Sequence, residues 1–570
     1  MTARAAELLL VNGSVHTVDP SLPTATVVAV RDGRIVAVGG DDVARDLRGP
    51  RTETIDVHGR TVLPGFQDAH AHPSDAGLGR SRCDLSQLED ADAYVSRVAG
   101  YAAEHAGAEW IVGGGWAMAA FPGGVPSKEA LDRAVPDRPV FLQSLDGHSA
   151  WLNSAALARA GIDERTPDPA DGRIERDARG EPLGALQEGA MELVQRIVPA
   201  PTTSEIADGL LEAQGYLHGL GITAWQEAIV GDTPSIHDCF DAYLALDRAG
   251  SLTGRVVGAL WWARDAGDRQ LATLLTRRER AASSCGRFRA SSVKFMVDGI
   301  CENLTASMLR PYLDREGHET HTSGRSFFEP EELAHFVTLV DAEGFQAHFH
   351  VIGDRAVREA LDAVEAAMRV SGRSDARHCA AHIQVVHPDD VVRFAALGVI
   401  ANGQPLWACN DPQMVELTLP VLGQERSAWQ YPFASLVRSG ARLCFGSDWP
   451  VSTPDVLAQV HVAVNRTAPP GEAGDAAGDG GGDGGGDGGD VVFLPDERLD
   501  LGTALGAFTM GSAYANHLDQ ETGSVTVGKR ADLVVLDRDV FSAPSSEIGL
   551  ARVDVTFVDG VIVHAAPSAL

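Results

Sequence analysis

The chain has few lysines, no long hydrophobic run and no paired-cysteine motif. Its 570 residues contain no uninterrupted apolar stretch of the length, about 20 residues, that a membrane-spanning helix needs. The seven cysteines are scattered and include no Cys-x-x-Cys pair, which indicates reduced thiols rather than a disulfide framework. The first twenty residues also lack the apolar core and cleavage pattern of a signal peptide. We therefore expect a cytoplasmic protein that does not associate with membranes.

Positive charge is scarce and comes almost entirely from arginine. The formal net charge of −32 disfavours binding to nucleic acid or to anionic lipid surfaces. Of the 47 lysines and arginines, only Lys128, Lys294 and Lys529 are lysines. Because arginine fills nearly every basic position, a lysine inside an apolar segment is a candidate for chemistry that arginine cannot perform. The expected partner is a small-molecule substrate, and the sequence also allows a homo-oligomer.

Both ends of the chain have the pattern of short β-strands. Near the start, apolar and polar positions alternate around Asn12-Gly13 and Asp32-Gly33, and Asp559-Gly560 lies in a similar stretch near the end. Such pairs favour the two-residue turns of β-hairpins. Neither end is long enough to bury a sheet face well by itself. We predict one small β-sandwich built from residues 1–62 and 520–570.

Between these ends, short apolar strands alternate with amphipathic helical segments, a pattern typical of a parallel sheet or barrel. A TIM barrel takes about 250 residues, so the chain has room for one barrel and attachments. We predict an α/β fold with a (β/α)8 barrel over residues 63–77 and 206–519, and a subdomain inserted after strand one at 78–205. The eight candidate strands are TVLPGFQDAHAH, GITAWQEAIV, GRVVGALWW, SSVKFMVDG, FQAHFHVIG, CAAHIQVV, GVIANGQP and ARLCFGSD.

A run of glycine and aspartate occupies residues 474–490. This composition cannot bury a core and is typical of a flexible loop. A calcium-binding repeat is the alternative, but the period here is four residues, which differs from the nonapeptide period of calcium-binding repeats. We therefore predict a linker.

Residues with metal-binding chemistry lie at the ends of several predicted barrel strands. His70 and His72 are two residues apart on strand one, so their side chains share a face. Taken alone, this pair only suggests a metal site and is more typical of ordinary polar strand ends. Lys294 lies in the apolar strand SSVKFMVDG, where a structural ion pair is the simple explanation. An amine can instead add CO2 to become an anionic carbamate ligand, which a guanidinium cannot.

Three further strands carry the same residue types. His348 and His350 share a face of strand five, and their spacing does not decide between them. His382 lies on strand six, and Asp448 ends strand eight in CFGSDWP, where a buried carboxylate is costly unless it meets a cation. Because the carboxyl ends of barrel strands meet at one face, packing alone does not explain this ordered set.

The same segments carry a resemblance to a known family. In chain order they read LPGFQDAHAHP, DGHSAWLNSAAL, GITAWQEA, KFMVDG, HVIGDRA, HIQVVHPDD, GSDWPV and GSVTVGKRADLVVLD. The chain resembles the amidohydrolase superfamily, in particular the branch that includes N-substituted formamide deformylase and uncharacterised metal-dependent hydrolases. The resemblance selects His350 over His348, because the ligand precedes the x-x-Gly-Asp turn. The implied metal ligands are His70, His72, Lys294, His350, His382 and Asp448.

The resemblance also implies the chemistry of the site. One or two divalent ions, Zn2+ first among them, would activate water, and a carboxylated Lys294 would favour two ions. Asp448 is the expected general base and acid. His148, in GHSAW, is expected to contact the substrate or the developing oxyanion, with capping of the following helix as the alternative. Further substrate contacts are expected from Asp298, Asn303 and Gln404.

The expected reaction is hydrolysis of an amide-like C–N bond in an N-acyl or N-formyl amine, a cyclic amide or a similar small molecule. Ester hydrolysis or deamination at the same site is an alternative, and a non-catalytic binding or regulatory barrel is another. Two departures from the family pattern bear on the substrate. ICENLTASMLRPYLD replaces a common Gly-Ser-Leu-Gly stretch and places Glu302 and Asn303 near the pocket, and Ala381 stands where a glutamate is common.

Overall fold

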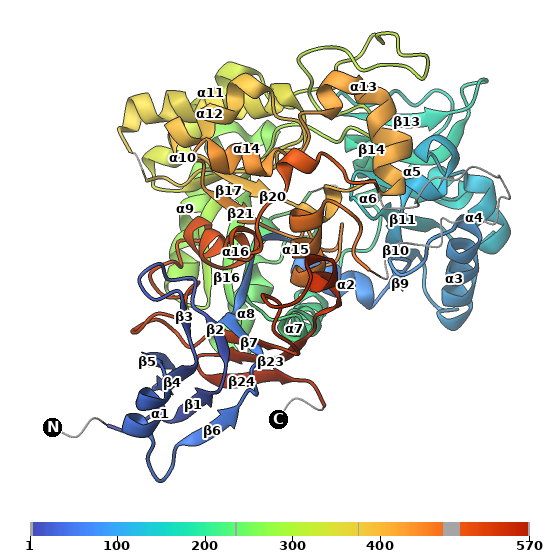
Figure 1. Ribbon diagram of the computed structural model, residues 1–570. Coiled ribbons are helices and arrows are strands. Elements are labelled where there is room, and N and C mark those ends of the chain that lie inside the picture. Colours follow the sequence, from blue (N-terminus) through green and yellow to red (C-terminus); the bar gives the residue numbers. More distant parts are fainter. Residues whose placement is uncertain (1–3, 234–235, 374, 471–490, 568–570) are drawn as a thin grey trace, which may run out of the picture.

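The computed structural model describes residues 4–233, 236–373, 375–470 and 491–567. It shows a barrel, a β-sandwich formed by the two chain ends, and an inserted subdomain on the other side of the barrel (Figure 1). The Gly/Asp-rich run at 474–490 lies outside the described residues, so its role as a linker stays a prediction.

Eight parallel strands form the barrel sheet, in the order β21-β20-β19-β18-β17-β16-β15-β8. The backbone amide of Asp448, after the last strand, donates to the carbonyl of His70 in the first strand at 2.7 Å, which brings the two edges together. The predicted (β/α)8 fold is therefore confirmed. The strands are β8 (Phe66–Ala71), β15 (Ile222–Val230), β16 (Arg255–Trp261), β17 (Phe288–Met296), β18 (Gln346–Val351), β19 (Cys379–His382), β20 (Ile400–Gly403) and β21 (Leu443–Phe445).

Amphipathic helices cover the outside of the barrel. In α11, Val357, Leu361 and Val364 recur every three or four residues and are buried against the strands. Among the described residues, no helix combines the length and hydrophobicity needed to span a bilayer. The covering helices include α7 (Thr203–Gly219), α8 (Phe240–Ala249), α9 (Leu271–Ala282), α10 (Pro330–Ala342), α11 (Asp354–Ser371), α12 (Pro388–Leu397), α14 (Phe433–Arg438) and α15 (Val456–Asn465).

Strands from both chain ends build the β-sandwich. One sheet has the order β5-β4-β1-β6, and the other has the order β24-β23-β22-β7-β2-β3. The second sheet joins the two ends directly, because β22 pairs antiparallel with β7. Leu10 and Val28 from the start of the chain share a core with Val535 and Phe557 from its end. The strands are β1 (Leu8–Val11), β2 (Ser14–His16), β3 (Thr24–Ala25), β4 (Val27–Arg31), β5 (Arg34–Gly39), β6 (Glu53–Asp56), β7 (Thr61–Pro64), β22 (Leu533–Leu536), β23 (Val553–Val558) and β24 (Val561–Ala565).

Two of the three predicted hairpin turns are hairpins in the structure. Asp32-Gly33 joins β4 to β5, and Asp559-Gly560 joins β23 to β24, with positive φ at all four residues. The prediction for Asn12-Gly13 is wrong, because the flanking strands β1 and β2 belong to different sheets. Asn12 does have a positive φ of 55°. The pair therefore turns the chain from one sheet to the other.

The segment between β8 and α7 forms a separate mixed sheet in the order β13-β14-β12-β11-β10-β9. Trp116, Leu142 and Trp151 are fully buried in a core of this subdomain. The end of β11 and the turn before β12, residues 143–148, lie at the mouth of the barrel. The elements are α2 (Pro73–Arg80), β9 (Cys83–Asp84), α3 (Ala91–Glu104), β10 (Ile111–Trp116), α4 (Lys128–Ala134), β11 (Val140–Ser144), β12 (Ser149–Leu152), α5 (Ser154–Ala160), β13 (Gly172–Arg176) and β14 (Pro182–Glu188).

Candidate active site

The six predicted metal ligands gather at the carboxyl ends of five barrel strands. Each of their side chains is buried, although together they carry an amine, a carboxylate and four imidazoles. They come from β8 or just after it (His70, His72), from β17 (Lys294), from β18 (His350), from β19 (His382) and from just after β21 (Asp448).

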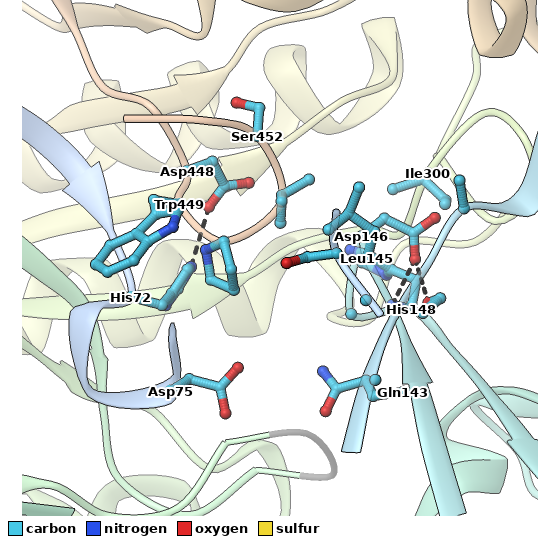
Figure 2. Close-up of a pocket in the computed structure, with 18 of the residues that line it drawn as sticks. His72, Asp75, Gln143, Leu145, Asp146, His148, Ile300, Asp448, Trp449 and Ser452 are labelled. Carbon is cyan, nitrogen blue, oxygen red and sulfur yellow. Dashed lines mark hydrogen bonds and ion pairs between the residues drawn. The ribbon is translucent and has the colours of Figure 1, made fainter. Parts of the chain in front are cut away.

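The carboxylate of Asp448 lies at the centre of this group. Its Oδ1 is 3.0 Å from Nε2 of His72 (Figure 2). The same oxygen is 3.3 Å from Nε2 of His70. Its Oδ2 is 3.9 Å from Nδ1 of His382. The same Nε2 atom of His70 is also 3.3 Å from the Nζ of Lys294. The Oδ1 of Asp448 therefore contacts the rings of both His70 and His72, and the ring of His70 also contacts the amine of Lys294.

These donors fit a divalent cation. Ligand atoms of His70, His382 and Asp448 all lie within 4.8 Å of one another. Burial, followed by neighbouring positive groups, holds the pKa of His70 and of His382 well below the ordinary range, so both rings are neutral and keep a lone pair. Within the described part of the chain, the buried Oδ1 of Asp448 accepts no hydrogen bond. Bonds from zinc to nitrogen or oxygen are about 2.0–2.2 Å, so the separations of 3.3 Å and 3.9 Å between the Asp448 carboxylate and the two rings are short enough for both rings to share an ion with it.

The two histidines of β18 have different positions. His348 lies behind His70, with its Nε2 2.7 Å from Nδ1 of His70. In the tautomer in which His70 donates its Nδ1–H to His348, the Nε2 of His70 keeps a lone pair for a metal. His350 lies on the cavity wall, with its ring centroid 4.4 Å from that of His382. The structure thus places His350 on the cavity wall, as the resemblance implied, and His348 in a supporting position.

Lys294 lies in an environment that favours a neutral amine. Its side chain is almost completely buried, and burial lowers its pKa to about 7, although the Asp448 carboxylate opposes the shift. Only a neutral amine can add CO2. The position is therefore chemically suited to the carbamate that the sequence suggested.

Backbone strain occurs at two of the strand ends that carry the ligands. His382, Ile383 and Asp448 have positive φ values of 75°, 42° and 57°. L-residues rarely adopt this conformation, and it costs roughly 1–3 kcal/mol where it persists. Such strain is typical of sites where side chains must be held in fixed directions.

His148 forms a buried ion pair across the cavity from Asp448. Its Nδ1 is 3.0 Å from both carboxylate oxygens of Glu188. Burial lowers the pKa of His148, but the charge and hydrogen bond of Glu188 outweigh it and raise the pKa to about 9. Thr305 Oγ1 also donates to Glu188, at 2.7 Å. His148 is followed by strand β12, not by a helix, so the helix-capping alternative is wrong.

Three predicted substrate contacts lie behind the cavity wall rather than on it. Asp298 accepts three backbone amides, those of residues 307, 352 and 353. Asn303 donates to Glu188 at 3.2 Å, and the Oε1 of Gln404 is 3.1 Å from Nδ1 of His382. None of the three lines the cavity, because each is bound to protein groups. Their part is to orient loops and side chains that do face the cavity, whereas Glu302 does line it.

Two buried glutamates at the site were not singled out from the sequence. Glu188 ends β14 with a φ of 51°, and Glu227 lies in β15 with one oxygen bonded to Tyr243 at 2.7 Å and to the Ser74 amide at 3.1 Å. Burial raises the pKa of Glu227 to about 7. A glutamate inside an otherwise apolar strand, as in GITAWQEAIV and PLGALQEGAM, is the signal that could have identified both.

A cavity of about 1540 Å³ opens onto these groups. One wall consists of barrel strand ends, and the facing wall comes from β11 and the turn before β12 in the inserted subdomain. Figure 2 shows His72 and Asp448 on one side and Gln143, Asp146 and His148 on the other. A small molecule in this space would contact both the barrel and the insertion.

Comparisons with known proteins agree with this geometry. The chain is 31% identical to Protein LONG AFTER FAR-RED 3 of Arabidopsis thaliana, over 97% of this chain and 91% of the relative. It is 27% identical to N-substituted formamide deformylase of Arthrobacter pascens, over 98% of both chains. An uncharacterized metal-dependent hydrolase from Pyrococcus furiosus has a similar structure, with a TM-score of 0.68 and 26% identity over 93% of this chain and 99% of that one. The amidohydrolase family profile matches residues 53–564, and the chain therefore belongs to the amidohydrolase family.

Proposed function

We propose that this metal-dependent hydrolase cleaves an amide-like C–N bond in a small N-acyl or N-formyl amine, a cyclic amide or a similar molecule. The observation that carries the proposal is the convergence of imidazoles, an amine and a carboxylate at one buried point on the cavity wall. The relative named N-substituted formamide deformylase supports a formamide or related amide as substrate.

The residues that would hold the metal are His70, His72, His350, His382 and Asp448, with Zn2+ as the proposed ion. When bound, such an ion supplies a Lewis acid that acidifies water and polarises a carbonyl oxygen. A carboxylated Lys294 would add an anionic oxygen ligand able to bridge two ions.

Two side chains would handle protons and charge during the reaction. Asp448 is in position to accept a proton from the attacking water and to pass it to the leaving nitrogen. His148 is protonated at neutral pH because of Glu188, so it can donate a hydrogen bond to the substrate oxygen as negative charge develops there. The inserted subdomain, which carries His148, would also exclude bulk water from the cavity.

The proposal is tested by metal content and a substrate panel. His70→Ala and His72→Ala should each lower bound zinc and turnover, because alanine supplies no lone pair. His335→Ala is the matched control, since His335 is half exposed and does not line the cavity, with its Nε2 3.0 Å from Asp268. The panel should contain formamides, other amides, cyclic amides, esters and amino-heterocycles. Full activity after exhaustive chelation would contradict the metal mechanism, and exclusive turnover of esters or amino-heterocycles would favour esterase or deaminase chemistry.

A further inference from the structure

Two polar side chains extend into the cavity without a protein partner. Asp75 lies in α2, three residues after His72, and Gln143 lies in β11 of the inserted subdomain. Both line the cavity, and Figure 2 shows their side chains pointing into the same open space. Within the part of the chain that the structure describes, neither side chain forms a hydrogen bond or an ion pair.

The carboxylate of Asp75 is left exposed to the cavity in an environment that disfavours its charge. Burial raises its pKa to about 6, and His72 and Arg82 are the positive groups that lower it. Neither of them forms an ion pair with Asp75. At neutral pH the group is therefore mostly ionised, and its oxygens are free to accept hydrogen bonds from a molecule in the cavity.

Apart from Asp448 at the candidate metal site, the other carboxylates around the cavity are already bonded or lie at its rim. Asp171 pairs with Arg264 at 2.6 Å, and Glu302 accepts the hydroxyl of Thr418 at 2.5 Å. Glu89, by contrast, is exposed to solvent. An exposed carboxylate keeps its hydration, whereas a sheltered one loses water and gains most from a new partner. Asp75 is therefore the carboxylate from which a bound ligand would gain most.

We propose that Asp75 and Gln143 form a recognition site for a positively charged, N–H-bearing group of the substrate, such as an ammonium. The aspartate would accept charge-assisted N–H hydrogen bonds, and the side-chain carbonyl of the glutamine would accept another. Asp75 and the proposed metal ligand His72 lie three residues apart on the lining of the same cavity, so one small substrate would place its charged group at Asp75 and its carbonyl at the metal site. This inference rests on the proposed function for the identity of that carbonyl, and it narrows the substrate class to cationic amides and formamides.

A matched pair of ligands tests the recognition site. 4-Aminobutanamide carries an ammonium where pentanamide carries a methyl group, and the two are otherwise alike in size. Titration calorimetry with the zinc-loaded full chain should show that the cation binds at least about tenfold more tightly, the equivalent of one charge-assisted hydrogen bond. Asp75→Asn should abolish this preference. Glu89→Gln, which removes the same charge from the cavity rim, should retain it.

A second variant guards against a folding defect in Asp75→Asn. Gln143→Glu adds a second carboxylate facing the same space and should increase the preference for the cation. Equal binding of the two ligands by the wild-type chain, or binding of neither, would overturn the inference. Preference for the cation without hydrolysis of any amide would leave the recognition site standing and refute the proposed function. Amide hydrolysis without a preference for the cation would support the proposed function and refute the recognition site.

Discussion

Lys294 is unusual both because lysine is rare in this chain and because its side chain is buried. The chain uses arginine in nearly every basic position, yet it places a lysine among apolar residues of β17, 3.3 Å from His70. An arginine there would keep the positive charge but could neither become neutral nor add CO2. The choice of lysine is therefore best explained by chemistry.

We predict that Lys294→Arg loses bound metal and at least about 10–100-fold of activity, the range already found when partners of metal ligands are removed. Lys294→Ala should be partly rescued by small carboxylates that occupy the vacant space. The matched control is Lys128→Arg, because Lys128 only donates to the Pro182 carbonyl, at 2.7 Å. Near-wild-type activity of Lys294→Arg would remove Lys294 from the ligand set, whereas an inactive but fully metallated variant would make it a substrate contact.

Glu188 is a positioning residue that acts through His148. Glu188→Gln keeps the shape of the side chain and removes its charge, so the pKa of His148 should fall and the ring should become neutral at neutral pH. We expect kcat to fall by up to about 100-fold while zinc content stays unchanged. Kinetics and metal analysis measure the two effects separately.

A double variant separates this role from a structural one. If Glu188 works through His148, then Glu188→Gln should cost little more in a His148→Ala background, because the two act as a unit. Glu181→Gln, an exposed change at the start of the same strand, is the control. Full additivity of the two substitutions would contradict the assigned role.

At the scale of elements, the barrel could be predicted because its signals are local and repeated. Each strand is a short, largely apolar run, and five of the eight carry a candidate ligand near the carboxyl end, which the barrel topology brings to one face. By contrast, a turn sequence does not show whether its two flanking strands pair with each other. Asn12-Gly13 and Asp32-Gly33 look alike in sequence, but only the second joins neighbouring strands of one sheet, because β1 pairs with β4 and β6 rather than with β2.

The same reasoning explains what was missed in the site. His148 and Glu188 are 40 residues apart and meet only because β12 pairs with β14 in the inserted sheet. No spacing rule links them. Asp298 and Gln404 were expected to contact the substrate, but the side chain of Asp298 binds backbone amides and that of Gln404 contacts His382.

Helix α2 is held in place by a close approach to α7. A Cβ atom on Gly77 would lie 2.0 Å from the carbonyl oxygen of Gly209, so the backbones could not stay in contact. We predict that Gly77→Ala displaces α2, costs about 1–3 kcal/mol of stability and disturbs His72 and Asp75 at its start. Thermal unfolding should show a lower Tm, and kinetics should show a higher KM.

Gly79 in the same helix provides the control. No heavy atom lies within 4 Å of a Cβ added there, so Gly79→Ala should be neutral or stabilise the helix by up to about 1 kcal/mol. Equal behaviour of the two variants would show that the contact between α2 and α7 does not fix the position of the helix.

At the scale of the whole molecule, the two chain ends and the site lie at opposite ends of the barrel. Arg255, at the start of β16, pairs with Asp532 and, at 2.5 Å, with Asp559, and so ties the sandwich to the amino end of the barrel. The candidate ligands lie at the carboxyl end and extend from residue 70 to residue 448. A bound ion would therefore link strands that are far apart in the sequence.

This arrangement predicts that metal stabilises the entire barrel. Without a cation, the buried carboxylate oxygen of Asp448 and several neutral imidazoles face one another with few complementary hydrogen bonds. Zinc that binds only the folded chain, at a free concentration of 100 times its Kd, would add about 2.7 kcal/mol to the free energy of unfolding. We expect chelation to lower the Tm by a few degrees and zinc to restore it. His72→Ala should weaken this response and His335→Ala should retain it, whereas an unchanged Tm on zinc addition to the wild-type apoprotein would show that the ligand cluster does not hold the barrel together.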